Sequence, residues 1–303
     1  MEKIYDIAVI GGGPAGLTAA LYGLRNGKKV VIIEKSVFGG QIVNSPKVEN
    51  IPGFETISGD EYGDLLLNQV TKQGCEIMFD EVKSIDSDGV LVTITMDMSE
   101  PVTSRTAIIA TGTVHRTLGL PYEEELIGKG IHFCAVCDGS FYKDKTVVMV
   151  GGGNSAFVEA EHLVDIVGKL IMLQDLPFYT AEQKLQDRVL AKDNIEKHVN
   201  TKVKEYIVDN EKLTGIKYEE NGELKQLECD GVFLAVGLVP QNDIFTAVAD
   251  VDERGYFIAD ESGKTKTGNI FVAGDCREKT LRQVATACSD GANAAIAACN
   301  SLK

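Results

Sequence analysis

Two glycine-rich turns, each lying between an apolar run and a helix-like segment, constrain this fold more than any other feature of the chain. The first turn, Gly11-Gly12-Gly13-Pro14-Ala15-Gly16, follows the apolar run 4–10 and precedes a helix expected over 17–25. A strand-like run over 29–33 then ends at Glu34, 18 positions after the last glycine. Glycines at this spacing bring a pyrophosphate to the helix N-terminus, and the following carboxylate can accept hydrogen bonds from a ribose. The segment therefore predicts a dinucleotide-binding βαβ unit.

The same pattern returns in the second half of the chain. Residues 145–150 are strand-like, the turn Gly151-Gly152-Gly153-Asn154-Ser155-Ala156 opens a helix expected over 155–167, and 169–173 is the next strand. Two βαβ units predict an α/β fold with two Rossmann-like domains. A length of 303 residues is sufficient for two domains.

Two further apolar runs are expected to be buried strands that end in small residues. The run 107–109 ends in Ala110-Thr111-Gly112, and the run 269–273 ends in Gly274-Asp275. At Ala110-Thr111-Gly112, where the first run ends, the protein backbone can approach a cofactor closely. The remaining expected elements are a strand over 231–236 and helices over 60–73 and 283–300.

The segment Cys134-Ala135-Val136-Cys137-Asp138 carries the clearest chemistry in the chain. Two thiols separated by two residues can close a small disulfide ring, and the neighbouring carboxylate can supply or take a proton. Because the thiolate is both nucleophile and leaving group in thiol–disulfide exchange, proton supply affects both steps. Cys134, Cys137 and Asp138 are therefore the candidate catalytic residues, and their place between two nucleotide-type turns suggests electron transfer from a cofactor to a disulfide.

Charge and cysteine usage exclude several classes of function. Thirty basic and 45 acidic residues give a net charge of −15, which argues against nucleic acid or an anionic membrane as partner. No apolar run is long enough for a membrane helix and no signal peptide is recognisable, so a cytoplasmic protein is expected. The five cysteines outside the motif are expected to be buried in reduced form. No metal site is expected, since ligand-spaced cysteine or histidine pairs are missing.

In combination, these motifs resemble the low-molecular-weight thioredoxin reductases over nearly the whole chain. The matching segments are Gly11–Gly16, Glu34, Gly39-Gly40-Gln41, Asn50-Ile51-Pro52-Gly53, Ala110-Thr111-Gly112, Cys134–Asp138, Gly274-Asp275 and Arg282-Gln283. The resemblance implies two Rossmann-like, three-layer ββα domains, with the second inserted into the first. An FAD-binding domain would comprise 1–115 and 243–303, and a pyridine-nucleotide-type domain carrying the CxxC motif would comprise 116–242. A homodimer is also implied.

The resemblance further implies which residues would hold FAD. The glycine turn would meet the pyrophosphate, Glu34 the adenosine ribose and Asp275 the ribityl chain. Gln41 and Asn50 would lie near the flavin ring. The full set expected at the cofactor is Gly11, Gly13, Pro14, Ala15, Gly16, Glu34, Gly40, Gln41, Asn50, Ala110, Thr111, Gly112, Gly274, Asp275, Arg282, Gln283 and Val284.

The resemblance also implies separate roles for the catalytic residues. Cys137 would lie against the flavin, and Cys134 would attack the disulfide of thioredoxin. Asp138 would be the acid that protonates the departing thiolate.

The sequence departs from the family where NADPH would bind. The family normally follows the strand after its second glycine turn with His-Arg-Arg and a further Arg, which hold the 2′-phosphate. This chain has Gln174, Asp175, Leu176 and Thr180 at those positions. Each lost charge-assisted contact is worth about 1.5–3 kcal/mol, and Asp175 would repel the phosphate. NADPH is therefore not the expected donor.

Two other electron donors remain open. Asp175 could accept a hydrogen bond from a ribose 2′-hydroxyl, as in an NADH enzyme. Against NADH, the stretch 176–179 is apolar and broken by a proline, and Phe157 places a large ring on the first turn of the second helix. This sequence is similar to the ferredoxin-dependent flavin thioredoxin reductases, which keep the fold and the CxxC motif but lack the NADPH residues. We therefore expect reduced ferredoxin as the donor and thioredoxin as the acceptor.

The segment 264–282 is a candidate ferredoxin docking site, with an ordinary solvated loop as the alternative. It has five basic and two acidic residues (5 − 2 = +3) in an otherwise acidic chain. Three alternatives of function remain besides an NADH enzyme. A flavin-dependent dithiol oxidase would make peroxide, a flavin-bound redox sensor would turn over slowly with every donor, and a protein without flavin would be colourless.

Overall fold

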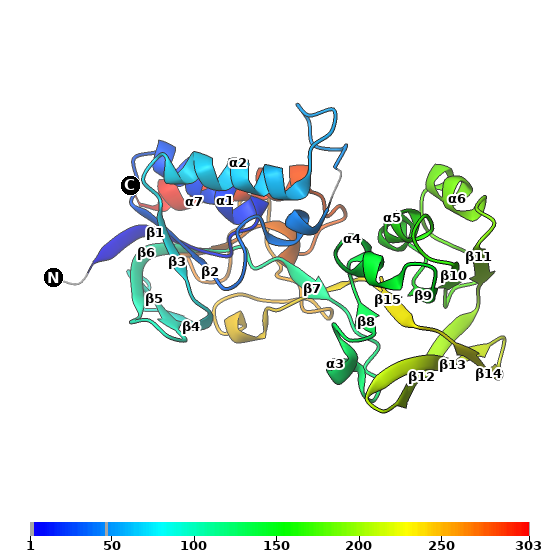
Figure 1. Cartoon of the computed structure of the whole chain (residues 1–303). Helices are drawn as coiled ribbons and strands as arrows, with labels where there is room; N and C mark the ends of the chain where they lie inside the picture. The colour runs from blue at the N-terminus through cyan, green and yellow to red at the C-terminus, as the bar shows by residue number, and fades with distance from the viewer. Residues whose placement is uncertain (1–2, 46–47, 303) are drawn as a thin grey trace. The chain divides into compact units, whose positions relative to one another are not determined.

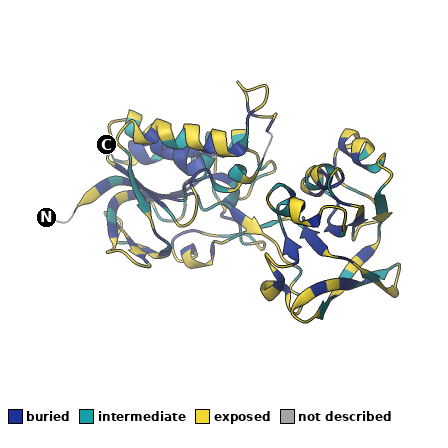
Figure 2. Ribbon diagram, viewed as in Figure 1, coloured by how far each residue is buried: buried dark blue, intermediate teal, exposed yellow. Residues whose placement is uncertain are grey.

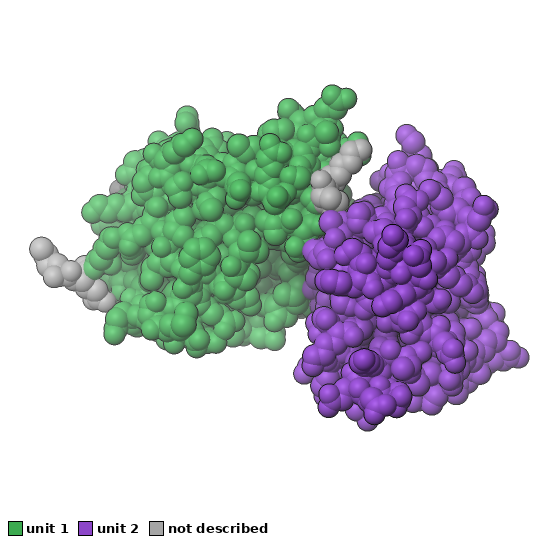
Figure 3. Space-filling model, in the orientation of Figure 1, with its two compact units in different colours: residues 1–114, 239–303 green, residues 115–238 purple. Residues whose placement is uncertain are grey.

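The computed structural model describes residues 3–45 and 48–302 (Figure 1). Residues 1, 2 and 303, at the two ends of the expected FAD-binding domain, lie outside the described part. The chain forms two compact units, residues 1–114 with 239–303 (unit 1) and residues 115–238 (unit 2) (Figure 3). The second boundary falls after Leu238 rather than after residue 242. Asn242 already belongs to unit 1, because its side-chain amide donates to the carbonyl oxygens of Gly255 and Cys276, each 2.8 Å away.

Unit 1 is built on five parallel strands in the order β3-β2-β1-β6-β17. Their bounds are β1 (Ile4–Ile10), β2 (Val30–Glu34), β3 (Glu76–Phe79), β6 (Val102–Ile109) and β17 (Ile270–Val272). The first half of β6 also pairs with an antiparallel extension formed by β5 (Val92–Met96) and β4 (Val82–Ser87). Helices α1 (Pro14–Arg25), α2 (Gly59–Thr71) and α7 (Val284–Ser301) lie on one side of the parallel strands in Figure 1.

Strand β1 is covered on both faces, which explains its continuous apolar sequence. Ile7 and Val9 pack with Leu17 of α1, whereas Ala8 and Ile10 belong to the layer formed with β4 and β5. Strands buried on both faces lose the alternation of polar and apolar residues that marks a half-exposed strand. Figure 2 shows these buried layers in dark blue.

The first glycine turn requires glycine at two positions, because a side chain there would clash with the backbone. Gly11 has a φ of 106°, and a Cβ there would lie 2.3 Å from the carbonyl oxygen of Ala110. A Cβ on Gly16 would lie 1.9 Å from the carbonyl oxygen of Gly11. Helix α1 begins at Pro14, earlier than the expected residue 17, because proline is preorganised for the first helical position and needs no N–H partner there.

Unit 2 repeats this plan. Its five parallel strands have the order β11-β10-β9-β15-β8, with bounds β8 (Ile131–His132), β9 (Thr146–Val150), β10 (Lys169–Leu173), β11 (Ile195–His198) and β15 (Gly231–Leu234). A separate antiparallel sheet consists of β12 (Thr201–Asp209), β13 (Lys212–Glu220) and β14 (Glu223–Glu228). The helices are α3 (Glu123–Leu126), α4 (Ala135–Asp138), α5 (Asn154–Leu163) and α6 (Gln183–Leu190).

Helix α5 is shorter than the expected 155–167. It ends at Leu163 because the side-chain amide of Asn194 donates to the carbonyl oxygens of Val164 and Val167, 2.9 and 3.0 Å away. This side chain replaces the helical hydrogen bonds that would otherwise continue the helix.

The chain passes between the units twice, within β7 (Thr113–His115) and β16 (Leu238–Pro240), which pair with each other. Short 3₁₀ turns complete the fold: η1 (Gly40–Asn44), η2 (Gly139–Tyr142), η3 (Asp243–Phe245) and η4 (Gly274–Cys276). The predicted fold class, two Rossmann-like α/β units, is confirmed.

Among the helices of residues 3–45 and 48–302, none has the length and apolar character needed to span a membrane.

Candidate active site

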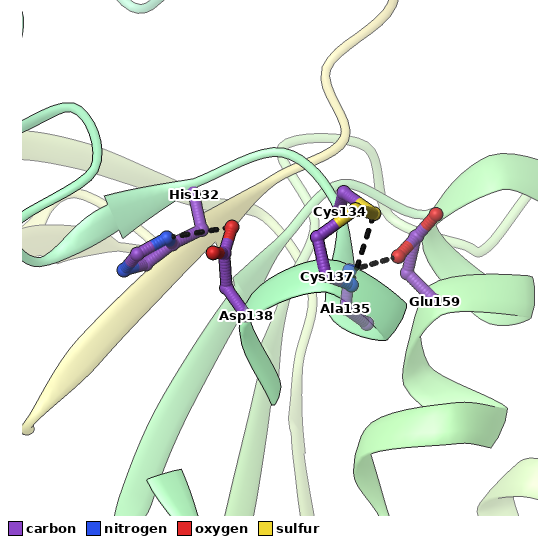
Figure 4. The surroundings of a disulfide bond; sticks show 6 residues. All are labelled: His132, Cys134, Ala135, Cys137, Asp138 and Glu159. Carbon is purple, nitrogen blue, oxygen red and sulfur yellow. Dashed lines mark hydrogen bonds and ion pairs between the residues drawn. A yellow bond between two sulfur atoms is a disulfide. The ribbon is translucent and has the colours of Figure 1, made fainter. Parts of the chain in front are cut away.

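Cys134 and Cys137 form a disulfide bridge at the start of α4, with their Cα atoms 5.4 Å apart (Figure 4). Cys134 is the N-cap residue of this short helix, and its sulfur accepts a hydrogen bond from the Cys137 N–H at 3.2 Å. Cys134 is half-buried and Cys137 is exposed. Backbone N–H groups at a helix start stabilise a thiolate, so the turn favours Cys134 as the reactive sulfur after reduction.

Asp138 contacts a histidine that the motif analysis did not select. Oδ2 of Asp138 lies 2.9 Å from Nδ1 of His132, an ion-pair distance at which the ring N–H points off the hydrogen-bond direction. The other ring nitrogen, Nε2, lies 2.8 Å from the hydroxyl of Tyr142. His132 is 4% exposed and its ring stacks on Phe233. Its only sequence signal is its position two residues before Cys134.

Glu159 of α5 was also missed by the motif analysis. Its carboxylate accepts a hydrogen bond from the N–H of Ala135, the first residue after Cys134 (Figure 4). Burial raises the pKa of the Glu159 carboxyl, and the Ala135 N–H offsets part of this effect. A Glu159 carboxylate competes with a Cys134 thiolate for the N–H groups of the turn. Glu159 therefore disfavours the negative charge on Cys134 that these N–H groups stabilise.

Glu34 is fixed at the end of β2 beside the first glycine turn. Its Oε2 accepts from the N–H of Gly12 at 2.6 Å, and its Oε1 accepts from the N–H of Ser36 at 2.8 Å. A carboxylate has about four acceptor directions, so lone pairs remain for ribose hydroxyls. Beside it lies a cavity of about 330 Å³, with Gly11, Glu34, Lys35 and Thr111 among its lining residues, all in unit 1.

Asp275 lies in η4, the turn that follows β17, and has a buried oxygen. Among the residues that the structure describes, its Oδ1 is one of four buried side-chain polar atoms without a hydrogen-bond partner. Burial raises the pKa of the Asp275 carboxyl, and the charges of Lys279 and Arg282 offset part of the rise. A buried acceptor of this kind requires donors such as the hydroxyl groups of a ribityl chain.

The other predicted cofactor residues also gather in unit 1. The Asn50 amide donates to the Gln283 side chain at 2.7 Å, and the Gln41 amide donates to the Thr113 carbonyl. Arg282 donates to the Asp275 carbonyl at 3.3 Å. Further members lie at the turns: Gly40 begins η1, Ala110-Thr111-Gly112 follow β6, Gly274 begins η4, and Val284 begins α7. The catalytic set Cys134, Cys137 and Asp138 lies in unit 2.

A match to a family sequence model covers residues 5–291 and carries the description pyridine nucleotide-disulphide oxidoreductase. The chain belongs to this family. It is 41% identical over 292 residues to the thioredoxin reductase of Listeria innocua, covering 96% of this chain and 91% of that one. It is 38% identical over 296 residues to the thioredoxin reductase of Bacillus subtilis, with 97% and 93% covered.

Solved structures agree with this family. The thioredoxin reductase of Lactococcus lactis superimposes with a TM-score of 0.93 at 34% identity, covering 97% of both chains. That of T. acidophilum gives 0.92 at 34% identity, with both chains covered completely.

Pyridine nucleotide-disulphide oxidoreductases of this kind are FAD-dependent, and unit 1 fits that cofactor. Gly13 has ordinary helix-start angles, and a Cβ there would meet nothing closer than the Cα of Gly40 at 3.9 Å. The turn thus leaves open space for a pyrophosphate at the start of α1. The buried acceptor of Asp275 and the cavity beside Glu34 supply the contacts for the remaining parts of the cofactor.

The chain that follows β10 packs against Gly152 of the second glycine turn, as Phe38 packs against Gly12 of the first turn. A Cβ on Gly152 would lie 2.6 Å from the Gln174 amide and 2.8 Å from the Tyr179 ring. The N–H groups of Thr180 and Ala181 donate to the Gly152 carbonyl at 2.8 and 3.1 Å. The Tyr179 ring also packs edge-on against Phe157, with centroids 5.1 Å apart. The segment contributes no Lys or Arg where the family holds the 2′-phosphate.

The predicted docking segment 264–282 does not form the basic surface expected of it. Arg277 and Lys279 are 9% and 8% exposed and both pair with Asp290 of α7. Lys266 pairs with Asp250 at 3.0 Å. Tertiary packing thus pairs three of the five cations, which a count along the sequence treats as free.

Asp290 instead organises the loop that carries Asp275. It accepts from the Arg277 guanidinium at 2.7 and 2.9 Å, from Lys279 at 2.8 Å, and from the Gly274 N–H at 3.1 Å. Burial alone would raise the pKa of Asp290, but the hydrogen bonds from Arg277 and Lys279 outweigh it and hold that pKa below its usual value. This contribution to stability is therefore present at neutral pH and is lost as pH falls through the depressed pKa.

We expect Asp290→Asn to destabilise unit 1 by about 3–5 kcal/mol, because it leaves two buried cations without a counter-charge. Thermal and denaturant unfolding of the flavin-loaded protein would measure the change. The control is Asp250→Asn, since Asp250 forms an exposed pair with Lys266 and exposed pairs contribute little. Equal, small effects of both substitutions would contradict the assignment.

Proposed function

We propose that this protein is a flavoprotein disulfide reductase that reduces thioredoxin through the Cys134–Cys137 dithiol. The observation that carries the proposal is a disulfide on an accessible helix start, directly followed by Asp138, in a chain whose first glycine turn fits FAD. Bound FAD would supply the electrons that reduce this disulfide. The 38% and 41% identical relatives named thioredoxin reductase support thioredoxin as the protein substrate.

The residues of the turn divide the exchange reaction between them. The Cys137 N–H stabilises a thiolate on Cys134, which attacks the substrate disulfide. Cys137 then attacks the resulting mixed disulfide and releases the substrate as a dithiol. Asp138 donates a proton to the departing thiolate. Phe141, four residues after Cys137, is 68% exposed and offers an apolar anchor for a protein substrate.

We further propose reduced ferredoxin, rather than NADPH, as the electron donor. One observation supports this proposal: the cations that would hold the 2′-phosphate are replaced by Gln174, Asp175, Leu176 and Thr180. Three of the five cations of segment 264–282 are paired within the chain, which weakens this segment as a docking site for the donor. A homodimer in the cytoplasm completes the proposal, supported by the family likeness and by five cysteines that form no disulfide, three of them buried.

NADH is the second candidate donor, favoured by one observation. Asp175 is exposed at the end of β10, where an acidic residue can accept hydrogen bonds from a ribose. Gly153 also has nearly the same backbone angles as Gly13, so the second turn keeps a phosphate-binding conformation.

Anaerobic mixing of the flavin-loaded protein with each donor tests the proposal. We expect chemically reduced ferredoxin to bleach the visible flavin absorption at least as fast as the enzyme turns over. It should also support reduction of thioredoxin. We expect NADPH to be at least about 100-fold slower, because several charge-assisted contacts are missing. Rapid bleaching by NADH would refute the ferredoxin proposal while leaving the disulfide reductase intact. Peroxide formation without thioredoxin reduction would identify a dithiol oxidase instead.

A further inference from the structure

The buried cluster behind Asp138 points to a second participant in proton supply. We propose that His132 is a positioning residue that orients the Asp138 carboxyl and shares with it the proton that Asp138 gives to a leaving thiolate. The inference rests on the proposed disulfide exchange at Cys134 and Cys137. It extends the site to a residue outside the CxxC-Asp motif.

The geometry ties His132 to Asp138 and leaves it little freedom to move. Nδ1 lies 2.9 Å from Asp138 Oδ2, and Nε2 lies 2.8 Å from the Tyr142 hydroxyl. The ring is stacked on Phe233, with centroids 5.2 Å apart, and packs edge-on against Tyr142. In Figure 4 the Asp138 carboxyl points toward this ring. The ring is held at Nε2 and on one face, so Nδ1 is a fixed neighbour of the Asp138 carboxyl.

The chemistry explains why a histidine is useful at this place. Carboxylic acids in water ionise near pH 4, so a carboxyl that acts as an acid near neutral pH needs a partner for its proton. Imidazole changes charge close to neutral pH and can hold the proton that the carboxyl needs. The Asp138 side chain is 30% exposed, whereas His132 is 4% exposed. A pair in which the buried ring shares one proton with the carboxyl therefore supplies acid over a wider pH range.

The other ionisable groups around the ring do not replace it in this role. Tyr142 faces Nε2, and burial, followed by the charges of Asp138, Asp230 and Cys229, raises the pKa of Tyr142 to about 12. The pKa of Cys229 is likewise raised to about 12, chiefly by burial. Lys145 lies over the Tyr142 ring at 5.5 Å. Tyr142 and Cys229 thus keep their protons at neutral pH, and Glu159 is bonded at Ala135.

The proposed step balances in protons and electrons. The Cys134 thiolate forms a bond to one substrate sulfur, and the substrate disulfide bond breaks. The second substrate sulfur leaves with the electron pair and takes the proton of Asp138. That proton is the one that the carboxyl shares with His132 Nδ1, and the pair regains one proton from water on the exposed side of Asp138.

The test uses two small disulfides and the full-length, flavin-loaded protein whose dithiol has been reduced chemically and desalted anaerobically. An aromatic disulfide releases a thiolate that needs no proton, whereas a dialkyl disulfide releases one that does. In His132→Gln we expect the rate with the dialkyl disulfide to fall about 10- to 100-fold at pH 8. The rate with the aromatic disulfide should stay within about twofold, since the leaving thiolate is stable alone.

The pH profile gives a second readout that a structural role would not move. With the dialkyl disulfide, the rate falls as pH rises and the shared proton is lost. We expect this fall to begin at lower pH in His132→Gln, because the carboxyl then holds its proton alone. His162→Gln, which changes an exposed histidine of α5, is the matched control and should behave as the unmodified protein.

A double-variant comparison decides whether His132 acts through Asp138. Asp138→Asn combined with His132→Gln should be no slower than Asp138→Asn alone. If the two substitutions lower the rate additively, the proposal is overturned. It is also overturned if His132→Gln slows reduction of both disulfides equally at every pH, which would indicate a packing defect. Because the probes are small disulfides, failure of the protein to reduce thioredoxin would sink the proposed function without deciding this outcome.

Discussion

Serine in place of either motif cysteine will abolish turnover with thioredoxin, lowering the rate by about 10⁴-fold or more, as expected when a covalent catalytic group is removed. Each variant retains one sulfur, and the two variants will differ in what they trap. Cys137→Ser leaves the Cys134 thiolate to attack thioredoxin with no second thiol to resolve the product. A stable mixed disulfide with thioredoxin should therefore accumulate in Cys137→Ser and not in Cys134→Ser, as measured by non-reducing electrophoresis and intact mass.

The control for this pair is Cys75→Ser in unit 1. Burial raises the pKa of the Cys75 thiol to about 12, so that sulfur is protonated and unreactive at neutral pH. Its removal should leave turnover and trapping unchanged. Trapping by Cys134→Ser instead of Cys137→Ser would reverse the roles assigned to the two sulfurs.

Alanine at Gly13 will weaken FAD binding in a protein that still folds. The added Cβ would meet no protein atom closer than 3.9 Å, so the chain accommodates it. It would instead occupy space beside the N-terminus of α1, where the pyrophosphate binds. Overpacking of this kind costs about 1–3 kcal/mol, so we expect FAD affinity to fall roughly 10- to 100-fold. Flavin release on dilution, followed by fluorescence, measures the affinity.

The repeated fold supplies a matched control in Gly153→Ala. Gly153 occupies the same place in the second turn, with φ of −88° against −77° at Gly13, and its Cβ would lie 3.6 Å from the Thr180 hydroxyl. If the second turn holds no nucleotide, Gly153→Ala will retain FAD and full activity with reduced ferredoxin. A selective loss of activity with NADH would contradict that expectation. Loss of secondary structure in Gly13→Ala would invalidate the assignment of open space at the first turn.

Much of the fold could be predicted because its determinants are local. The apolar run before each glycine turn, the turn itself and the following helix pattern specify β1-α1 and β9-α5 without reference to distant residues. The boundaries were less certain where distant side chains end an element. Helix α5 stops at Leu163 because Asn194, far along the chain, bonds to the carbonyls that follow it.

Charge was the property that sequence counting misjudged. The five cations of segment 264–282 predicted a basic surface, yet Arg277 and Lys279 are buried against Asp290 of α7. A charge acts at a surface only if no partner reaches it, and the partner here comes from another element. The same limit hid Glu159, whose contact with Ala135 follows from the packing of α5 beside the CxxC turn.

The sequence by itself determined the two Rossmann-like units, the disulfide-forming pair Cys134 and Cys137, and the loss of the phosphate-binding cations after β10. These depend on spacing and residue type within short segments. Only the tertiary structure decided that Tyr179 packs against Gly152 and that His132 faces Asp138 and Tyr142. The physical reason is that short segments encode turns and burial, whereas the partner of a polar group is chosen by the packing of the whole unit.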